Sequence, residues 1–506
     1  MVGKVHSAAV LGISAEIIEV EADVCGGFPS FEMTGNLGKS AKEAKNRVYT
    51  AIKNSKIKIG PSKITVNMSP ANIRKEGPHF DLAVAIAVLC AGGVIENREL
   101  NDILFIGELG LEGQINPVKA VFPMLLKAVD KGYRICIIPK QNENEARYVR
   151  GILVIGITSL SECVAYLRGI KEIQPVSVQD DISGMISDID NDFDEIKGQK
   201  ALKRAAAVAA ASMHNILMIG PPGGGKTMTA SRIISLMPPP TGEQCIEITK
   251  VYSVAGLLNN GEGLITKRPF RAPHHTITAA AMAGGGAYPV PGEISLAQHG
   301  ILFLDELNLF DRRTIETLRS PMEKGTVTID RVYGKYEYPG NFMLAAAMNP
   351  CKCGYYPDRN KCRCTQSEIN RYFGRISRPI LDRIDICVWA DRVEYDDLKK
   401  DADEKNNTAA MREKVMNAYK LQEKRYENCI FKRNSCIPDK YISEYCVLEK
   451  DAEQLIKSAF DKYDLTARGY KRTLKVARTI ADMENHDRIT VSDVAEAVGY
   501  RMVENG

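Results

Sequence analysis

Short apolar runs in the middle of the chain each end in a polar or glycine-rich segment. The clearest runs occupy 215–219, 301–304 and 342–348, and their length and continuity predict buried strands. A helix-compatible segment at 228–237 follows the first run, and three prolines at 238–240 forbid its continuation. This alternation of strand and helix predicts an α/β core.

The pattern differs on either side of this core. Strand-like runs at 64–70 and 103–109 alternate with helical segments at 40–54 and 81–91, which predicts a separate α+β domain near the N-terminus. From residue 171 to residue 192, polar and acidic residues replace the regular spacing of apolar residues, as is typical of a linker. After Trp389 the chain becomes helical and charged. The predicted organisation is an N-terminal domain at 1–170, a linker at 171–192, an α/β core at 193–390 and a helical lid at 391–506.

Composition narrows the class of protein. The chain has 506 residues, 44% of them hydrophobic and 26% charged, which is typical of a globular protein of several domains. The longest apolar stretch, 83–95, has 13 residues with two glycines and is too short to cross a bilayer, so it predicts a core helix. Without a signal or transit pattern, the expected location is cytoplasmic, with no membrane partner. A net charge of +4 means that any nucleic-acid contact depends on local patches.

The first core strand leads into a glycine-rich loop, GPPGGGKT, at 220–227. The string fits G-x-x-x-x-G-K-[ST], in which glycines let backbone N–H groups turn inward around phosphates. Lys226 is expected to reach the β and γ phosphates of ATP, and Thr227 to hold Mg²⁺. The predicted nucleotide-binding residues of this segment are Gly220, Pro221, Pro222, Gly223, Gly224, Gly225, Lys226, Thr227 and Met228.

A pair of carboxylates ends the second core strand, in the string ILFLDE at 301–306. Asp305 is predicted to hold Mg²⁺ through water. Glu306, one residue further, is placed to polarise the attacking water, as in ATPases that hydrolyse rather than only bind. The loop and this pair together predict ATP hydrolysis.

Four of the thirteen cysteines fall within 14 residues and form two C-x-C pairs. Thiolate tetrads suit zinc, which favours tetrahedral sulfur coordination. We therefore expect a structural Zn²⁺ site, with four reduced thiols on a loop as the alternative. The predicted ligands are Cys351, Cys353, Cys362 and Cys364.

Basic residues surround the cysteines. Residues 352–383 hold eight Lys or Arg against three acids, with aromatic residues interleaved, a pattern that fits nucleic acid or a basic subunit interface equally well. The segment 326–340 alternates like a β-hairpin, and Arg331 and Lys335 near its tip are candidate phosphate contacts. His274 and His275 follow Pro273, and the favoured interpretation is a hydrogen-bonded turn rather than a metal or catalytic site.

Longer strings carry a family resemblance over nearly the whole chain. They are GPPGGGKT, RPFRAPHHTIT, GGGAYPVPGEISLAQHGILFLDEL, AAMNPCKCGYY and RISRPILDRID. With them the sequence resembles the YifB/ComM family of magnesium-chelatase-like AAA+ ATPases. The resemblance implies a P-loop AAA+ core with a helical C-terminal lid. It also implies a hexameric ring with shared ATP sites, acting on single-stranded or branched DNA as a branch-migration helicase in recombination or transformation.

The same resemblance implies roles for residues outside the loop. Asn349 takes a sensor position at a strand tip, and Arg383 takes the place of an arginine presented to the neighbouring subunit's nucleotide. Arg472 takes the place of a second sensor arginine, which acts either in its own subunit or in the neighbouring one, with Arg468 as its nearest competitor. Ile196 and Gln199 lie where related ATPases enclose the adenine.

The N-terminal domain looks like the Lon-protease type (ribosomal protein S5 domain 2-like). Such peptidases carry a serine in a G-P-S-A-G context, whereas this chain reads EGPHFD with His79 at that place. The position of the lysine partner falls on Phe122, and Lys119 is out of register. Without nucleophile and base, peptidase activity is not expected. The domain is expected to be a structural or nucleic-acid-binding module.

Two functions remain. The leading interpretation is a ring-forming DNA motor that hydrolyses ATP. The alternative is a chelatase-type ATPase subunit that drives metal insertion or other protein remodelling, although the N-terminal domain and the cysteine cluster do not belong to that subunit's pattern.

Overall fold

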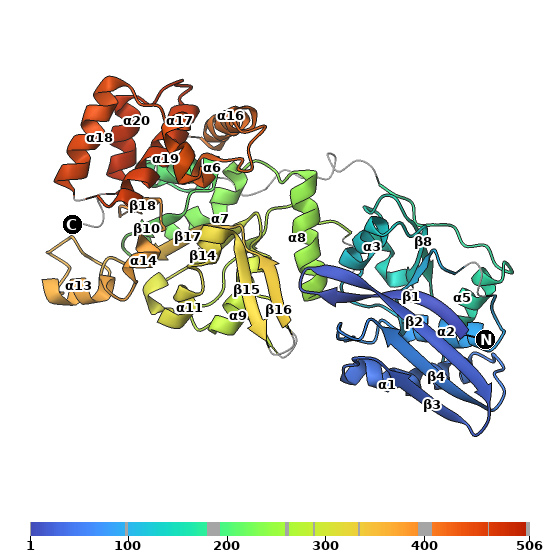
Figure 1. Cartoon of the computed structure of the whole chain (residues 1–506). Coiled ribbons are helices and arrows are strands. Elements are labelled where there is room, and N and C mark those ends of the chain that lie inside the picture. The colour runs from blue at the N-terminus through green and yellow to red at the C-terminus, as the bar shows by residue number, and fades with distance from the viewer. Residues whose placement is uncertain are drawn as a thin grey trace.

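The chain forms two α/β parts, with one helix, α8, lying between them and a helical bundle at the C-terminal end (Figure 1). The computed structural model describes residues 2–96, 100–179, 193–258, 263–286, 289–331, 334–392, 407–463 and 465–501. Residues 180–192, which make up most of the predicted linker, lie outside the described residues.

A seven-stranded mixed sheet in the order β3-β4-β2-β1-β5-β8-β9 organises the N-terminal part. One apolar cluster joins the sheet to α1 and α2, and a second joins it to α3. The strands are β1 (Val2–Leu11), β2 (Ser14–Gly26), β3 (Ser30–Thr34), β4 (Ser62–Ser69), β5 (Ile103–Phe105), β8 (Ile135–Pro139) and β9 (Leu153–Ile157), beside a small ladder of β6 (Glu108–Leu109) and β7 (Ile115–Asn116). The helices are α1 (Lys39–Asn54), α2 (Asp81–Ala91), α3 (Val121–Asp130), α4 (Glu143–Ala146) and α5 (Leu160–Leu167).

The apolar stretch beginning at residue 83 lies in α2, and every residue of that helix is buried. The prediction of a core helix is therefore confirmed. The single strand expected at 103–109 is wrong, because β5 and β6 are separate. Between them, the Gly107 N–H donates to the carbonyl of His79, and the Gly107 carbonyl accepts from Leu82 N–H. The backbone leaves the sheet there to pair with the entry into α2.

The second α/β part is built on a five-stranded parallel sheet in the order β11-β14-β17-β10-β18. The three apolar runs that predicted strands form β10, β14 and β17 at its centre. The strands are β10 (Ile216–Ile219), β11 (Phe270–Arg271), β14 (Ile301–Leu304), β17 (Met343–Met348) and β18 (Ile386–Trp389). The helices are α6 (Lys200–Ser212), α7 (Lys226–Leu236), α9 (Ala279–Ala283), α10 (Glu293–Leu296), α11 (Arg312–Glu316), α12 (Pro321–Lys324), α13 (Gln366–Phe373) and α14 (Arg378–Leu381).

Residues 194–211 read DEIKGQKALKRAAAVAAA and are compatible with a single helix, yet α6 begins only at Lys200, because Gln199 adopts a left-handed backbone conformation with φ 55°. A 3-10 turn (Phe193–Glu195) precedes this break. The break brings the Gln199 side chain to the strand end at Asp391, described below.

Two hairpins project from the core side by side. The longer pairs β15 (Thr326–Arg331) with β16 (Gly334–Pro339), as the alternating pattern predicts, and the shorter pairs β12 (Gly284–Gly285) with β13 (Val290–Pro291). The Tyr338 hydroxyl, near the base of the longer hairpin, donates to the Pro289 carbonyl in the loop of the shorter one, so the two hairpins are in contact.

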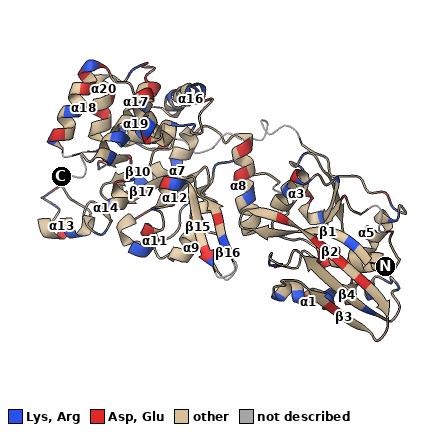
Figure 2. Cartoon of the chain, in the orientation of Figure 1, with Lys and Arg blue, Asp and Glu red and all other residues tan. Residues whose placement is uncertain are grey.

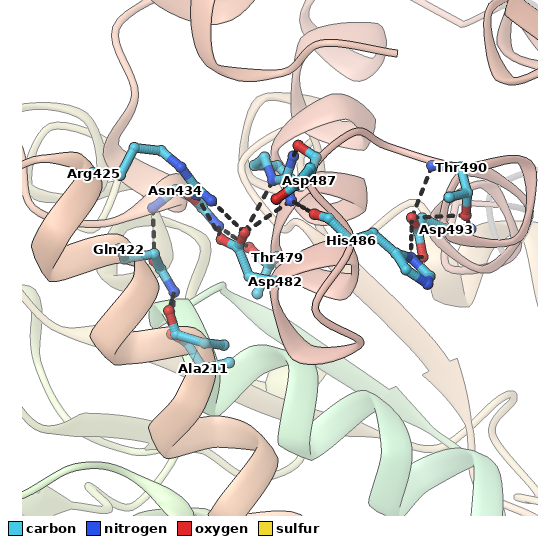
Figure 3. Close-up of polar contacts among 12 residues, drawn as sticks. Ala211, Gln422, Arg425, Asn434, Thr479, Asp482, His486, Asp487, Thr490 and Asp493 are labelled. Atoms are coloured by element: carbon cyan, nitrogen blue, oxygen red, sulfur yellow. Dashed lines mark hydrogen bonds and ion pairs between the residues drawn. The ribbon is translucent and has the colours of Figure 1, made fainter. Parts of the chain in front are cut away.

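The C-terminal lid comprises α16 (Thr408–Arg425), α17 (Ile442–Tyr445), α18 (Lys450–Lys462), α19 (Ala467–Met483) and α20 (Val491–Gly499). A buried carboxylate, Asp482, links its helices (Figure 3). It accepts two hydrogen bonds from Arg425, at 2.6 and 2.8 Å, and others from Asn434 and Arg478. Because these donors come from α16, from α19 and from the segment between α16 and α17, the network holds α19 in a defined position.

Helix α8 (Gly242–Ala255) connects the two α/β parts. Cys245 of α8 belongs to the same apolar cluster as α3. The Ser253 hydroxyl donates to Glu145 at 2.7 Å, and this carboxylate also accepts from Asn142 and from the Phe122 N–H. Burial raises the pKa of Glu145, against the effect of these donors. The interface is thus a packed, hydrogen-bonded contact.

Candidate active site

The glycine-rich loop lies at the carboxyl end of β10 and leads directly into α7. Gly223 and Gly225 have φ values of 77° and 75°, a region that residues with a Cβ atom enter at a cost. The sequence GPPGGGKT therefore forms a tight turn whose backbone N–H groups and helix N-terminus suit phosphate.

Lys226 is the first residue of α7, and its ammonium group stays within the loop. It donates to the carbonyls of Gly220 and Pro221, at 2.6 and 2.8 Å, and to the Asn349 amide oxygen at 3.3 Å. Burial lowers the pKa of Lys226, and Asp305 and Glu306 oppose this effect. The lysine and the predicted sensor amide, which follows β17, thus meet at one point.

Two further predicted residues meet beside the loop. The Thr227 hydroxyl donates to the Asp305 carboxylate at 2.8 Å. A hydroxyl and a carboxylate oxygen at this separation are hard ligands of the type that Mg²⁺ takes in nucleotide sites. These are the two residues that could hold the ion.

Glu306 has a left-handed backbone, with φ 51° and ψ 49°, and an exposed side chain. Its N–H donates to Asp305 Oδ1 at 2.9 Å. A non-glycine residue in this region costs about 1–3 kcal/mol, and such strain is concentrated at functional sites. The turn ends the strand and places Glu306 at the same edge as Thr227 and Asp305.

Gln199 lies beside the loop through its contact with Asp391. Its amide donates to the Asp391 carbonyl and accepts from the Asp391 N–H at 3.1 Å. Ile196 is buried in the core cluster next to α6, and Met228 is 43% exposed in the first turn of α7. The residues predicted to enclose the adenine and those of the glycine-rich loop therefore come from segments that meet near one edge of the sheet.

Arg383 lies elsewhere. It precedes β18, its side chain is only 1% exposed, and it donates to Glu323 and to the carbonyl of Pro379. Burial lowers the pKa of Arg383, whereas Glu323 raises it. Arg468 of α19 donates to the same Glu323 carboxylate at 2.9 Å.

Arg472 is close to Arg383 but has different partners. It donates to Asp385 at 2.5 Å and to the backbone carbonyl of Arg383 at 2.6 Å. Burial would raise the pKa of Asp385, yet Arg472 and His214 bring it well below its usual range. Arg472 and the start of β18 are thus joined by a strong, partly buried ion pair.

The strand register shows how far apart these groups are. In the parallel pair of β10 and β18, Ile216 faces Ile386 and Ile219 faces Trp389. The glycine-rich loop follows Ile219, whereas Asp385 precedes Ile386. Four residues of strand, roughly 13 Å at about 3.3 Å each, separate the two edges. The structure brings Lys226, Thr227, Asp305, Glu306 and Asn349 together at the carboxyl edge, and Arg383 and Arg472 at the amino edge.

The four cysteines of the predicted zinc site converge. Their sulfur atoms all lie within 4.8 Å of one another, and Cys351 Sγ is 3.3 Å from Cys353 Sγ and 3.7 Å from Cys362 Sγ. A tetrahedral ion with Zn–S bonds of about 2.3 Å requires sulfurs about 3.8 Å apart. All four are free thiols, and in the described part of the chain no other His, Cys, Asp or Glu group is arranged in this way. The site is compatible with zinc.

The cysteine loop touches the nucleotide loop. Gly354, with φ 83°, lies so close to Pro222 that an added Cβ would meet the proline ring at 2.8 Å. The loop also begins two residues after Asn349. Its geometry is therefore tied to both the phosphate loop and the sensor amide.

Other candidate residues have local partners. Arg331 donates to the Gly286 carbonyl at 3.3 Å, which links the two hairpins, and Lys335 is exposed. His274 Nδ1 lies 2.9 Å from the Thr276 hydroxyl, in agreement with the expected hydrogen-bonded turn.

The residues at the peptidase positions bring neither nucleophile nor base. His79 is buried, and its Nε2 must donate to the Ala8 carbonyl, 2.9 Å away, because a carbonyl only accepts. Burial lowers the pKa of His79 to about 4. Phe122 is fully buried and Lys119 is exposed.

Two partners of the amino-edge arginines, Glu323 and Asp385, were missed by the sequence interpretation. Asp385 stands two residues after Arg383 in the string DRID. This short spacing could have identified Asp385 as a charged neighbour of the arginine site. Glu323 is 60 residues from Arg383, and no local pattern connects them.

A parallel sheet that delivers GPPGGGKT to a helix, with an acidic strand end beside Thr227, defines a P-loop nucleoside triphosphatase. Family models agree: residues 192–398 match magnesium chelatase, subunit ChlI; residues 20–142 match subunit ChlI of Mg-chelatase; and residues 405–501 match the magnesium chelatase subunit ChlI C-terminal model.

Two similar proteins match almost the whole chain. Competence protein ComM of Haemophilus influenzae is 38% identical over 98% of this chain and 97% of its own length. YifB of Escherichia coli is 37% identical over 99% of this chain and 97% of its own length. A shorter similarity, 27% identity over 28% of this chain and 18% of the relative, links it to Lon protease of Trichlorobacter lovleyi. The chain belongs to the YifB/ComM family of magnesium-chelatase-like AAA+ ATPases with an N-terminal Lon-protease-like domain. Its described helices include none with the length and apolar character needed to cross a membrane.

Proposed function

We propose that the protein is a ring-forming motor that hydrolyses ATP to remodel DNA, as a branch-migration helicase in recombination or transformation. Within one chain, Arg383 and Arg472 lie at the opposite edge of the sheet from the phosphate loop. This separation supports an ATP site that two subunits share. In a ring, the amino edge of one subunit would face the ATP bound by its neighbour.

At the carboxyl edge, the proposed chemistry uses five side chains. Lys226 exchanges its loop carbonyls for the β and γ phosphates, and Thr227 and Asp305 would hold Mg²⁺, which would neutralise developing charge on the phosphates. Glu306 polarises the attacking water, and the Asn349 amide orients that water or the γ phosphate.

At the amino edge, Arg383 and Arg472 supply the remaining charge. Arginine stays protonated and grips phosphate oxygens with two donors, so it stabilises the charge that spreads during phosphoryl transfer. For Arg383 to reach a neighbouring nucleotide, its contact with Glu323 has to be exchanged for phosphate. The expected assembly is a hexamer.

The DNA part of the proposal rests on two supports. A relative that is 38% identical over almost the full chain is named a competence protein. The β15–β16 hairpin carries Arg331 and Lys335 close to its tip, where cations can contact phosphates. We further propose that Cys351, Cys353, Cys362 and Cys364 hold a structural Zn²⁺ that fixes the loop between Asn349 and α13.

The matching chelatase models favour one alternative, an ATPase subunit that drives metal insertion or other protein remodelling. Both functions use the same ATP chemistry, and they differ in the macromolecule that stimulates it.

The test is the steady-state ATPase rate with and without single-stranded, duplex and four-way-junction DNA, at low and moderate salt. The DNA motor predicts strong stimulation that persists at moderate salt and disappears in Lys226→Ala. That variant removes a buried charge contact worth about 2–5 kcal/mol, so its ATP affinity should fall roughly 30-fold to several thousand-fold. An assembled, ATP-competent protein that no DNA stimulates would favour the chelatase-like alternative.

A further inference from the structure

The surface of helix α1 in the N-terminal part has an unusual charge. Residues 39–75 contain ten Lys or Arg and one acid, Glu43. Arg47 pairs with buried Asp81, Arg74 pairs with Glu76, and Lys75 is buried. The other seven cations are exposed and form no ion pair with a described residue: Lys39, Lys42, Lys45, Lys53, Lys56, Lys58 and Lys63.

The helical positions concentrate this charge on one face. Lys39, Lys42, Asn46, Tyr49 and Lys53 recur every three or four residues, so their side chains share one side of α1. The opposite side packs into the core through Ala41, Ala44, Val48, Ala51 and Ile52. Burial of that side fixes the orientation of the helix and presents the lysine face to solvent.

The face combines charge with an aromatic ring and amides. Tyr49 is 52% exposed between Lys45 and Lys53. From residue 39 to residue 53 the helix rises about 21 Å, and a duplex of that length carries roughly a dozen phosphate charges. Lysines interleaved with Tyr and Asn are typical of surfaces that contact a nucleic-acid backbone without reading its sequence.

The charge is local to this part of the surface. Figure 2 shows Lys and Arg along α1 and acidic residues along β2, where Glu19, Glu21 and Asp23 follow one another at alternate positions. The whole chain has a net charge of only +4, so this patch creates a field that the chain as a whole does not.

We propose that the lysine face of α1, continued by Lys56, Lys58 and Lys63, is a second DNA-binding surface that holds the phosphate backbone outside the site of ATP-driven movement. The proposal rests on the proposed action on DNA and assigns the Lon-like domain a role in it. This surface binds DNA without base specificity and independently of bound nucleotide.

The experiment compares two charge-reversed proteins that differ only in the place of the change. One carries Lys42→Glu, Lys45→Glu and Lys53→Glu on α1. The matched control carries Lys450→Glu, Lys457→Glu and Lys462→Glu on α18, where the three lysines are also exposed. Net charge changes equally in both, and thermal unfolding monitored by circular dichroism checks that each keeps the parent fold.

The readout is fluorescence anisotropy of a labelled duplex at several salt concentrations, without nucleotide. We expect the α1 variant to lose at least roughly tenfold in affinity. Its slope of log K against log salt should fall by about 2 to 3, since each lost phosphate contact removes about 0.9. The α18 variant should match the parent in both quantities.

Equal affinity and slope for the parent and the α1 variant would overturn the α1 surface and leave the DNA motor intact. A parent protein that binds no DNA would overturn both. Flotation with vesicles containing anionic lipid tests a membrane partner instead. If the parent protein binds these vesicles but not the duplex, and the α1 variant loses the vesicle binding, the assignment to DNA is also overturned.

Discussion

The two edges of the five-stranded sheet are built in opposite ways. At the carboxyl edge, Thr227 and Glu306 are exposed, and Lys226 is held by neutral carbonyl and amide oxygens that phosphates can replace. At the amino edge, Arg383 is buried against Glu323 and Arg472 is paired with Asp385. One edge is arranged to receive a nucleotide, and the other holds charge in place.

This difference gives a physical reason for the proposed ring. Arg472 is fixed to the amino edge by Asp385, and α19, which carries it, is fixed in turn by the Asp482 network (Figure 3). An arginine held in this way loses little freedom when a neighbouring subunit brings phosphate to it. The chain would then bind ATP by itself and hydrolyse it efficiently only within a ring.

The largest expected effect comes from removing Arg383. Arg383→Ala should reduce ATP turnover by about 10³–10⁵, the range for an arginine that acts across an interface, while ATP affinity changes only a few-fold. Steady-state rates and binding of a fluorescent ATP analogue measure the two quantities. Arg468→Ala is the matched control, because Arg468 shares the Glu323 carboxylate but is 52% exposed.

Mixing sharpens this test. Arg383→Ala subunits combined with Glu306→Gln subunits should regain activity, because some interfaces then contain an intact glutamate and an intact arginine. Mixed rings that form but stay inactive, or an equal loss in Arg468→Ala, would contradict a site shared through Arg383.

The next effect concerns the carboxyl edge alone. Glu306→Gln should bind ATP and lose about 10²–10⁴ in turnover, because the amide cannot accept the proton of the attacking water. Single-turnover hydrolysis in rings made only of this variant measures the chemical step. Near-normal turnover would remove Glu306 from the proposed role.

The link between lid and amino edge can be broken at Asp482. Asp482→Asn leaves the buried guanidinium group of Arg478 and the half-buried one of Arg425 without their counter-charge and should destabilise the lid by about 3–5 kcal/mol. Denaturant unfolding measures this loss. The control Glu484→Gln weakens partly exposed ion pairs with Arg204 and Lys414 and should cost about 1 kcal/mol or less. Similar losses in both variants would show that Asp482 does not organise the lid.

The smallest effect is expected at the cysteine loop. Cys362→Ser should lower zinc from about one ion per chain to near zero by elemental analysis. Through the Gly354–Pro222 contact, it should weaken ATP binding by no more than roughly tenfold, about 1.4 kcal/mol. Cys436→Ser, which changes an exposed thiol far from the cluster in sequence, should keep the metal. A parent protein without zinc after metal-replete expression would exclude the site.

The sequence by itself determined which polar residues lie together at the strand ends. Lys226, Thr227 and Asp305 could be predicted because a glycine-rich turn and a strand terminus are local structures, and parallel strands bring their carboxyl ends to one edge. The four cysteines were also predictable, because short spacing limits how far their sulfurs can separate. The helix α2 followed from the length of its apolar run.

Only the tertiary structure decided which edge each arginine occupies. The string RISRPILDRID identifies Arg383 as a candidate, but its partner Glu323 is 60 residues away and Arg472 reaches Asp385 across 87 residues. Such contacts depend on how β18 pairs with β10 and how the lid packs on α6, which no local pattern encodes. The break before α6 at Gln199 and the separation of β5 from β6 have the same origin, because in each case a side-chain or backbone hydrogen bond to a distant segment overrides the local preference.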